Sequence, residues 1–150
     1  MHEIVIVDTS VLIALEKIGL LDILCKVYEE IILPEGVVQE FGGIDTGCHT
    51  VRTVKSGLID ILMRDLNLGI GESEVIALAY ENKNKALIDD SKARKIAERF
   101  GLTISGSIGV LLKAEKMGLI ESAYNKVVEL KNKGFYVSEE LLSTISKYKI

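Results

Sequence analysis

The sequence of 150 residues has no tryptophan, only one proline and fewer basic than acidic residues. Its 18 Lys and Arg residues are outnumbered by 22 Asp and Glu residues, which gives a formal net charge of −4. This balance argues against a broad basic surface for nucleic acid but is compatible with a local one. No apolar run approaches the roughly 20 residues of a membrane span, and the chain reaches Asp8 too early for a signal peptide. We therefore expect a cytoplasmic protein with no membrane segment, folded as one domain over residues 1–150.

Cysteine and histidine are also scarce. Cys25 and Cys48 lie 23 positions apart and match no metal-binding or redox spacing, so we expect small buried or half-buried thiols in a reducing compartment. His2 lies at the N-terminus, and His49 has no partner at metal-ligand spacing. A zinc site or a histidine-based hydrolase is therefore not expected, and any chemistry must come from the carboxylates.

Short apolar runs alternate with segments of helical periodicity along the chain. This alternation is typical of a parallel sheet with helices on both faces. The predicted fold class is a three-layer α/β/α arrangement with a central parallel sheet of about five strands and C-terminal helices. The predicted strands are 4–7, 31–33, 58–63, 86–88 and 102–104. The predicted helices begin near residue 11 and continue with 20–30, 35–41, 51–56, 72–82, 91–100, 108–117, 120–133 and 138–147.

Acidic residues follow two of the predicted strands directly. Asp8 comes after strand 4–7, and Asp89 and Asp90 come after strand 86–88. Functional groups of parallel sheets collect at the carboxyl ends of the strands. Helix capping is the simpler alternative at each position, because Asp is a favoured N-cap residue.

Two further acids lie on predicted helices: Glu40, and Glu72 with Glu74 nearby. A solvated side chain and an acid favoured by the helix dipole are the simpler alternatives. If the fold brings all these acids to one edge, they raise one another's pKa unless a cation is present. An all-oxygen ligand set selects Mg²⁺ or Mn²⁺. The chemistry that most often needs such a cluster is phosphodiester hydrolysis with two metal ions.

Four segments of the chain, in order, resemble the motifs of the PIN-domain family, most of whose members are metal-dependent ribonucleases. IVIVDTSVLIA resembles the opening strand with its first acid, Asp8, and LPEGVVQEF resembles the second motif, with Glu40. GESEVIALA resembles the third motif, with Glu72 in place of the usual Asp and Glu74 as the second choice. Because Glu is one methylene longer than Asp, this departure could shift or weaken a metal site.

The fourth motif has two adjacent acids. ALIDDSKAR matches it with Asp90 as the first choice and Asp89 as its neighbour, and the following GSIGVLLKAEKMGLI resembles a prokaryotic PIN subgroup of poorly defined role. The resemblance implies that Asp8 and Asp90 bind a metal ion directly, and that Glu72 binds it directly or through water. It also implies that Glu40 orients a water on the metal or holds a second ion. Ser10 is expected to hydrogen-bond a ligand or a substrate phosphate, with helix capping as the alternative.

Contact with RNA requires basic residues beside the acids. Lys92 and Arg94 on the helix after Asp90 are the main candidates, and a solvated helix face is the alternative. Other basic residues in this part of the sequence are Lys83, Lys85, Lys95 and Arg99. With five Tyr, three Phe and no Trp, recognition by phosphate and shape is favoured over base stacking.

The leading hypothesis is an Mg²⁺- or Mn²⁺-dependent PIN-type endoribonuclease acting on RNA, with the toxin of a toxin–antitoxin pair, bound by an antitoxin protein, as a narrower possibility. The alternative is a catalytically weak RNA-binding or oligomeric assembly module. A phosphatase with an aspartyl nucleophile is disfavoured, because Ser10 replaces the second Asp of that family's opening motif. Apolar residues of the C-terminal helices favour a homodimer, although core packing would use the same side chains. They are Leu111, Leu112, Leu119, Ile120, Val127, Val128 and Leu130.

Overall fold

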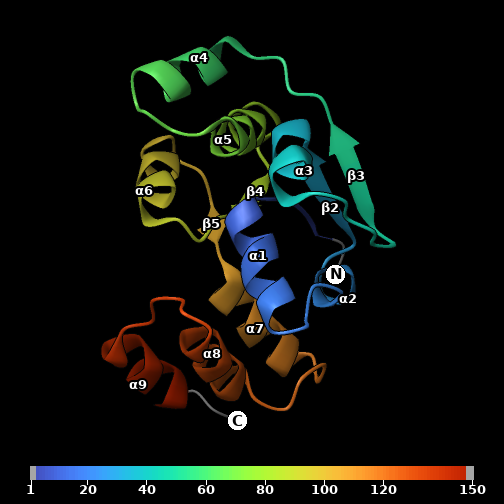
Figure 1. The fold of residues 1–150 in the computed structure, drawn as a ribbon, viewed down its shortest axis with the longest axis vertical. Coiled ribbons are helices and arrows are strands. Elements are labelled where there is room, and N and C mark those ends of the chain that lie inside the picture. Colours follow the sequence, from blue (N-terminus) through green and yellow to red (C-terminus); the bar gives the residue numbers. More distant parts are fainter. Residues whose placement is uncertain (1–2, 148–150) are drawn as a thin grey trace.

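A computed structural model describes residues 3–147 and contains a five-stranded parallel sheet. The strands lie in the order β3-β2-β1-β4-β5, so the first strand is central (Figure 1). Val5 of β1 pairs with Ile31 of β2, and Val7 pairs with Leu87 of β4. The strands are β1 (Ile4–Val7), β2 (Glu30–Pro34), β3 (His49–Arg52), β4 (Lys85–Leu87) and β5 (Ile104–Ser105).

Helices flank the sheet and complete the three-layer α/β/α fold that the sequence predicts. Helix α5 lies across β1, β2 and β4, with α3 and α4 packed on it, while α7 contacts α1, α2 and β5. Figure 1 shows α4 at one end of the long axis and α8 with α9 at the other. No helix within residues 3–147 is long and apolar enough to cross a membrane. The helices are α1 (Thr9–Lys17), α2 (Ile23–Val27), α3 (Glu35–Phe41), α4 (Gly57–Arg64), α5 (Ile70–Asn82), α6 (Ser91–Arg99), α7 (Ser107–Lys116), α8 (Ala123–Asn132) and α9 (Glu139–Lys147).

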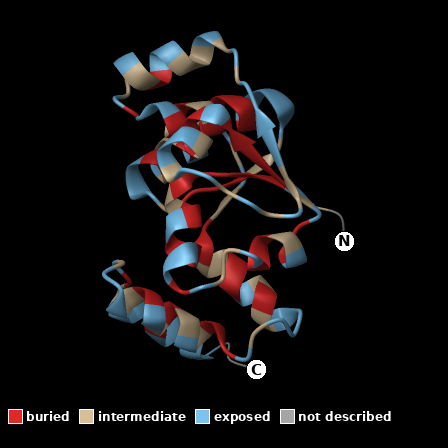
Figure 2. Ribbon diagram, turned by 45° about the vertical axis from the view of Figure 1, so that its right-hand side comes forward, coloured by how far each residue is buried: buried red, intermediate tan, exposed pale blue. Residues whose placement is uncertain are grey.

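The core surrounds the central strand. Val5, Ile6 and Val7 are completely buried, because helices cover both faces of the sheet. Figure 2 shows the buried residues gathered on the sheet and on the helix faces turned toward it. This packing holds the carboxyl end of β1, and therefore Asp8, in a fixed position.

Two predicted elements are wrong. Residues 51–56, predicted as a helix, overlap β3, and residues 58–63, predicted as a strand, form α4. Strand β3 is at the edge of the sheet and is mostly exposed, so it has no apolar run to mark it. Helix α4 buries Leu62, and its first turn is capped by Ser56, whose hydroxyl accepts a 3.2 Å hydrogen bond from the Leu58 N–H. The apolar residues of segment 58–63 therefore follow the spacing of a helix with one buried face, not that of a strand.

The expectation of two free thiols is also wrong. Cys25 of α2 and Cys48 form a disulfide, with their Cα atoms 5.6 Å apart. The Cys48 carbonyl accepts a 3.1 Å hydrogen bond from the Ile31 N–H, so pairing of β2 with β3 brings this cysteine next to α2. The disulfide lies at the amino edge of the sheet, where β2 and β3 begin, and it removes the basis for expecting a reducing compartment.

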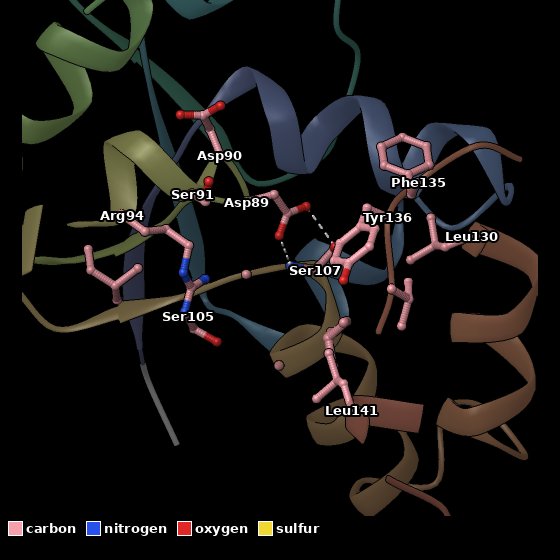
Figure 3. Close-up of a pocket in the computed structure, with 15 residues that line it drawn as sticks. Asp89, Asp90, Ser91, Arg94, Ser105, Ser107, Leu130, Phe135, Tyr136 and Leu141 are labelled. Carbon is pink, nitrogen blue, oxygen red and sulfur yellow. Dashed lines mark hydrogen bonds between the residues drawn. The ribbon is translucent and has the colours of Figure 1, made fainter. Parts of the chain in front are cut away.

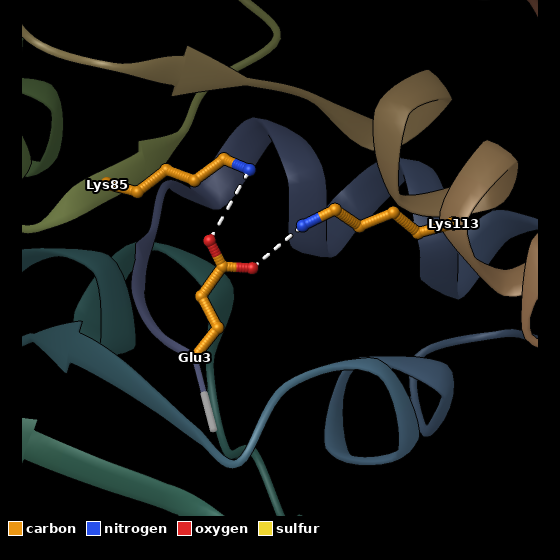
Figure 4. Close-up of polar contacts among 3 residues, drawn as sticks. All are labelled: Glu3, Lys85 and Lys113. Carbon is orange, nitrogen blue, oxygen red and sulfur yellow. Dashed lines mark hydrogen bonds and ion pairs between the residues drawn. The ribbon is translucent and has the colours of Figure 1, made fainter. Parts of the chain in front are cut away.

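An ion cluster occupies the same amino edge of the sheet. The Glu3 carboxylate lies 2.7 Å from Lys113 Nζ and 3.6 Å from Lys85 Nζ (Figure 4). The hydrogen bond from Lys113 lowers the pKa of Glu3, and the Lys113 ammonium also lies 5.1 Å from the centre of the Tyr28 ring. The cluster joins the starts of β1 and β4 to α7. Lys85 therefore lies at the edge opposite Asp8 and is not near the predicted acidic site.

The apolar C-terminal residues divide between the core and the surface. Leu111, Val127 and Leu130 are buried, whereas Leu112 and Leu119 are 38% and 37% exposed. Packing within one chain therefore uses several of the side chains that favoured a dimer. The homodimer stays a prediction.

Candidate functional site

The carboxyl edge of the sheet brings the first and fourth motifs together. β1 and β4 are neighbours, and the Asp8 N–H donates a 2.9 Å hydrogen bond to the Leu87 carbonyl. The chain leaves β4 through Ile88 and reaches Asp89 and Asp90 immediately afterwards. Acids that are about 80 positions apart in the sequence therefore lie at one edge.

Asp8 is a buried carboxylate that is only partly compensated. Its side chain is 2% exposed, and Oδ2 accepts hydrogen bonds from Ser10 Oγ at 2.6 Å and Ser10 N at 3.3 Å. Oδ1 is buried with no hydrogen-bond partner among the described residues. Burial raises the pKa of Asp8, and the charge of Glu40 adds to the rise, while hydrogen bonds from Ser10 and from the Thr9 N–H oppose it. An unpaired buried carboxylate oxygen is costly unless something binds it.

Ser10 connects the two strand ends. Its hydroxyl donates to Asp8 and accepts a 3.0 Å hydrogen bond from the Asp89 N–H. The Asp89 carboxylate is used in turn by α7, accepting from Ser107 N at 2.8 Å and from Ser107 Oγ at 2.7 Å. A Cβ on Gly106 would meet Asp89 Oδ1 and Arg94 Nη1, so the absence of a side chain there leaves room for both groups in their present positions. Asp89 therefore joins β4 to α7.

Asp90 and Glu72 face each other across the same edge. Asp90 caps α6, because its Oδ2 accepts a 2.9 Å hydrogen bond from the Ala93 N–H, and Figure 3 shows it pointing away from Asp89. Glu72 caps α5 by accepting a 3.3 Å hydrogen bond from Gly69 N. Burial raises the pKa of Glu72, and the charges of Asp8 and Asp90 add to the rise. Glu72 therefore lies close enough to both aspartates for electrostatic repulsion between the carboxylates.

Glu40 reaches the edge from α3. Its Oε1 accepts a 3.3 Å hydrogen bond from Thr9 Oγ1, next to Asp8. A Cβ on Gly71 would meet the same oxygen, so the Glu40 carboxylate can keep this position because residue 71 has no side chain. Glu74 points elsewhere and accepts a 2.8 Å hydrogen bond from Gly36 N at the start of α3. The structure therefore gathers Asp8, Glu40, Glu72 and Asp90, with Ser10 between the strand ends, and uses Glu74 to join two helices.

The donor set matches a hard divalent cation in kind, since every candidate ligand atom is a carboxylate or hydroxyl oxygen. The unpaired Oδ1 of Asp8 also fits a cation. In their present rotamers, however, no three His, Cys, Asp or Glu side chains within residues 3–147 are arranged to hold one metal ion. Glu72 and Asp90 are instead held by backbone N–H groups.

Two basic side chains of α6, the helix that Asp90 caps, form hydrogen bonds with backbone carbonyls. Lys92 Nζ donates a 3.1 Å hydrogen bond to the Asn67 carbonyl, on the segment between α4 and α5. Arg94 Nη1 donates a 2.8 Å hydrogen bond to the Ile88 carbonyl and lines a pocket beside β5. Both cations are therefore fixed at the acidic edge through backbone carbonyls.

Sequence reasoning missed Ser107 and the pocket that it lines. This pocket of about 650 Å³ lies between the ends of β4 and β5 and the segment after α8 (Figure 3). A signal was available for Ser107, because it lies three positions after the last predicted strand, 102–104, and the carboxyl end of that strand lies at the same sheet edge as Asp8. Nothing in the sequence marked Phe135 and Tyr136 as the far wall.

A five-stranded parallel sheet flanked by helices, with acidic side chains at its carboxyl edge, defines a three-layer α/β/α protein. Within that class, a family model described as DUF3368, a PIN domain, matches residues 4–148, and the chain belongs to the PIN-domain family. PIN domains are generally nucleases that act on RNA, and they usually use divalent metal ions. No curated protein matches the chain significantly.

Proposed function

We propose that this protein is a Mg²⁺- or Mn²⁺-dependent endoribonuclease whose centre is Asp8. The observation that carries the proposal is the buried, unpaired Oδ1 of Asp8 beside three further acids. A fold that needed Asp8 only to cap α1 would have no use for additional carboxylates around it. A cation accounts for both features, because it compensates the cluster and binds the unpaired oxygen.

Asp8, Asp90 and Glu72 are the proposed metal ligands, and Glu40 orients a water molecule or supports a second ion. When bound, divalent cations activate water and stabilise the leaving oxygen of a phosphodiester. The N–H groups of Gly69 and Ala93 compete for oxygens of Glu72 and Asp90, so metal affinity depends on how readily these capping bonds exchange. The extra methylene of Glu72, compared with the usual Asp, permits that movement.

The remaining residues position the ligands and the substrate. Ser10 fixes the Asp8 carboxylate and ties it to the β4 end through the Asp89 N–H. Lys92 and Arg94 are proposed to contact RNA phosphates near Asp90, because their backbone hydrogen bonds hold them at this edge. Ser107 and Asp89 maintain the distance between β4 and α7.

The cleavage assay is direct. Purified protein with Mn²⁺ should cut a single-stranded RNA, and Asp8→Asn and Asp90→Asn should each abolish cutting while remaining folded by circular dichroism. Asp65→Asn, on the C-terminal side of α4, is a matched control that should keep activity. Cleavage that persists in both Asp8→Asn and Asp90→Asn would refute the proposed site.

A toxin role, with an antitoxin protein as partner, is a narrower proposal that rests on the resemblance to small PIN proteins. Its test is induced expression in a bacterial host. Wild-type protein should arrest growth, and Asp8→Asn should not. Equal growth of the two strains, with both proteins present at the same level, would contradict this role.

A second candidate is a catalytically weak RNA-binding or assembly module. One observation favours it: no three carboxylates within residues 3–147 are arranged around a common ion position. This alternative predicts RNA binding or oligomerisation without turnover. It replaces the nuclease proposal if Mn²⁺ neither binds to the wild-type protein nor promotes cleavage.

A further inference from the structure

The pocket beside the acidic edge has two unlike walls. One wall is formed by the end of β5 and the starts of α6 and α7, and it carries Arg94 of α6 and Ser107 of α7. The other is formed by the end of α8 and the segment that leads to α9, and it carries Phe135 and Tyr136. In Figure 3, Arg94 and Tyr136 lie on opposite sides of the Asp89–Ser107 pair. The pocket, at about 650 Å³, falls within the range of roughly 300–1,000 Å³ that holds small ligands.

Tyr136 is an unusual surface residue. Its side chain is 91% exposed, far more than any other exposed large hydrophobic residue that the structure describes. Leu130 and Leu141 line the same pocket, so the Tyr136 ring is almost fully exposed to solvent and lies beside an apolar surface. An exposed aromatic ring beside a pocket is a platform on which a flat ring can stack.

Arg94 supplies the positive charge of the opposite wall. One of its guanidinium nitrogens is anchored to the Ile88 carbonyl, and it forms no ion pair with a carboxylate within residues 3–147. The nearest acid of the pocket wall, Asp89, already accepts two hydrogen bonds from Ser107. The guanidinium is therefore held in place with donors left for an anion.

We propose that this pocket binds one unpaired nucleotide of the RNA, with its base stacked on Tyr136 and its phosphate on Arg94. A flat base fits the aromatic wall, and a phosphate fits the unused donors of Arg94, the one cation among the described lining residues, which also include Asp89 and Asp90. Asp90 lies toward Glu72 and Asp8, the acids beside which the neighbouring phosphodiester would be cut. A base within an A-form duplex is already stacked and does not present a free face. The RNA must therefore be single-stranded at this position. The proposal rests on the proposed ribonuclease function, because that function decides that the strand continues from the pocket toward the acids.

The absence of tryptophan makes this proposal measurable by fluorescence. Tyr136→Trp places the chain's only indole in the pocket, and Tyr80→Trp is the matched control, because Tyr80 is 50% exposed beside a different pocket that includes Lys83 and Phe100. Each variant is titrated in EDTA, where nothing is cut, with an eight-nucleotide single-stranded RNA and with a duplex of the same sequence. We expect saturable quenching of the indole fluorescence of Tyr136→Trp by the single strand alone, and no saturable change in Tyr80→Trp.

Binding by the variants completes the test. Tyr136→Ala should weaken single-strand binding, measured by fluorescence anisotropy of a labelled RNA, by roughly 5- to 150-fold, the range for loss of one base–aromatic stack. Arg94→Gln should weaken it and lower its salt dependence. Equal quenching by duplex and single strand, or no quenching by either, would overturn the proposal. So would a response only to an added protein partner, which would indicate a docking surface for a polypeptide.

Because these measurements use no metal, they separate the two proposals. Wild-type protein that fails to cleave RNA, together with quenching in Tyr136→Trp, would refute the nuclease and retain the nucleotide pocket. Cleavage with unchanged KM in Tyr136→Ala would refute the pocket and retain the nuclease.

Discussion

The two edges of the sheet differ in how their charged side chains are compensated. At the amino edge, Glu3 lies between the ammonium groups of Lys85 and Lys113, and the Cys25–Cys48 disulfide lies nearby on the β2–β3 side. At the carboxyl edge, Asp8 has acids for neighbours and one oxygen without a partner among the described residues. The amino edge therefore pairs its charges and contributes to stability, whereas the carboxyl edge carries an electrostatic cost that protonation or a bound cation would relieve.

The same contrast has opposite consequences for pH. The pKa of Glu3 is lowered by Lys113, so its contribution to stability is present at neutral pH and is lost as the pH falls through the folded-state pKa. The pKa values of Asp8 and Glu72 are raised by burial and by neighbouring carboxylates. Above their folded-state pKa these two groups are charged and destabilise the fold, and their cost disappears as the pH falls below the unfolded-state value.

The largest predicted effect distinguishes two glutamates on one helix. Glu72→Gln should lower the rate of RNA cleavage about 100-fold or more, because even residues that only support metal ligands account for roughly 10- to 100-fold. Glu74→Gln should keep near wild-type activity, since an amide oxygen can still accept the hydrogen bond from Gly36 N. Comparison of kcat/KM with Mn²⁺ checks both variants. A larger loss in Glu74→Gln than in Glu72→Gln would reverse the assignment.

The disulfide should affect stability without affecting the site. Replacing both Cys25 and Cys48 with serine should lower the free energy of unfolding by about 3 kcal/mol, because the bond closes a loop with a sequence separation of 23. Urea unfolding at pH 7 measures this difference. Cleavage per folded molecule should stay unchanged at a temperature where the variant is folded, and a selective loss of activity would show that the two edges are coupled.

Asp8→Asn should make the fold less sensitive to pH. The neutral amide removes a buried charge whose pKa is raised by the fold, so the decline in wild-type stability as the pH rises above the unfolded-state pKa of Asp should become shallower. Added Mg²⁺ should raise the unfolding temperature of the wild type at pH 7 and leave Asp8→Asn unchanged. Parallel pH curves for the two proteins would contradict an electrostatic cost at this residue.

The smallest predicted effect is at the amino edge. Glu3→Gln should destabilise the protein by about 0.5–1 kcal/mol, since the ion cluster is partly exposed to solvent. The difference between variant and wild type should shrink at high salt, because screening weakens exposed ion pairs. Urea unfolding at two salt concentrations tests this, and a difference that does not respond to salt would point to packing instead.

Much of the fold could be predicted because its central elements carry strong local signals. β1 is a buried apolar run ended by Asp8, and α6 begins at a capping Asp90. Residues 51–56 were predicted as a helix and residues 58–63 as a strand, whereas they overlap β3 and α4. β3 could not be recognised because an exposed edge strand has no apolar run. The disulfide depends on the pairing of β2 with β3, which residue spacing does not reveal.

The candidate site could be predicted only in part. The sequence predicts that acids follow neighbouring strands. It does not predict that the adjacent acids Asp89 and Asp90 have different roles. Asp89 binds Ser107 while Asp90 faces Glu72, and this depends on how β4 meets α7. The position of Tyr136 beside the site depends on where α8 ends against the sheet, which no local pattern in the sequence encodes.

The central claim is that the acids around Asp8 form a binding site for a divalent cation. Isothermal titration of the protein with Mn²⁺ tests it without RNA or turnover. We predict saturable binding by the wild type and by Glu3→Gln, and loss of that binding in Asp8→Asn. Absence of binding to the wild type, or equal binding to Asp8→Asn, would contradict it.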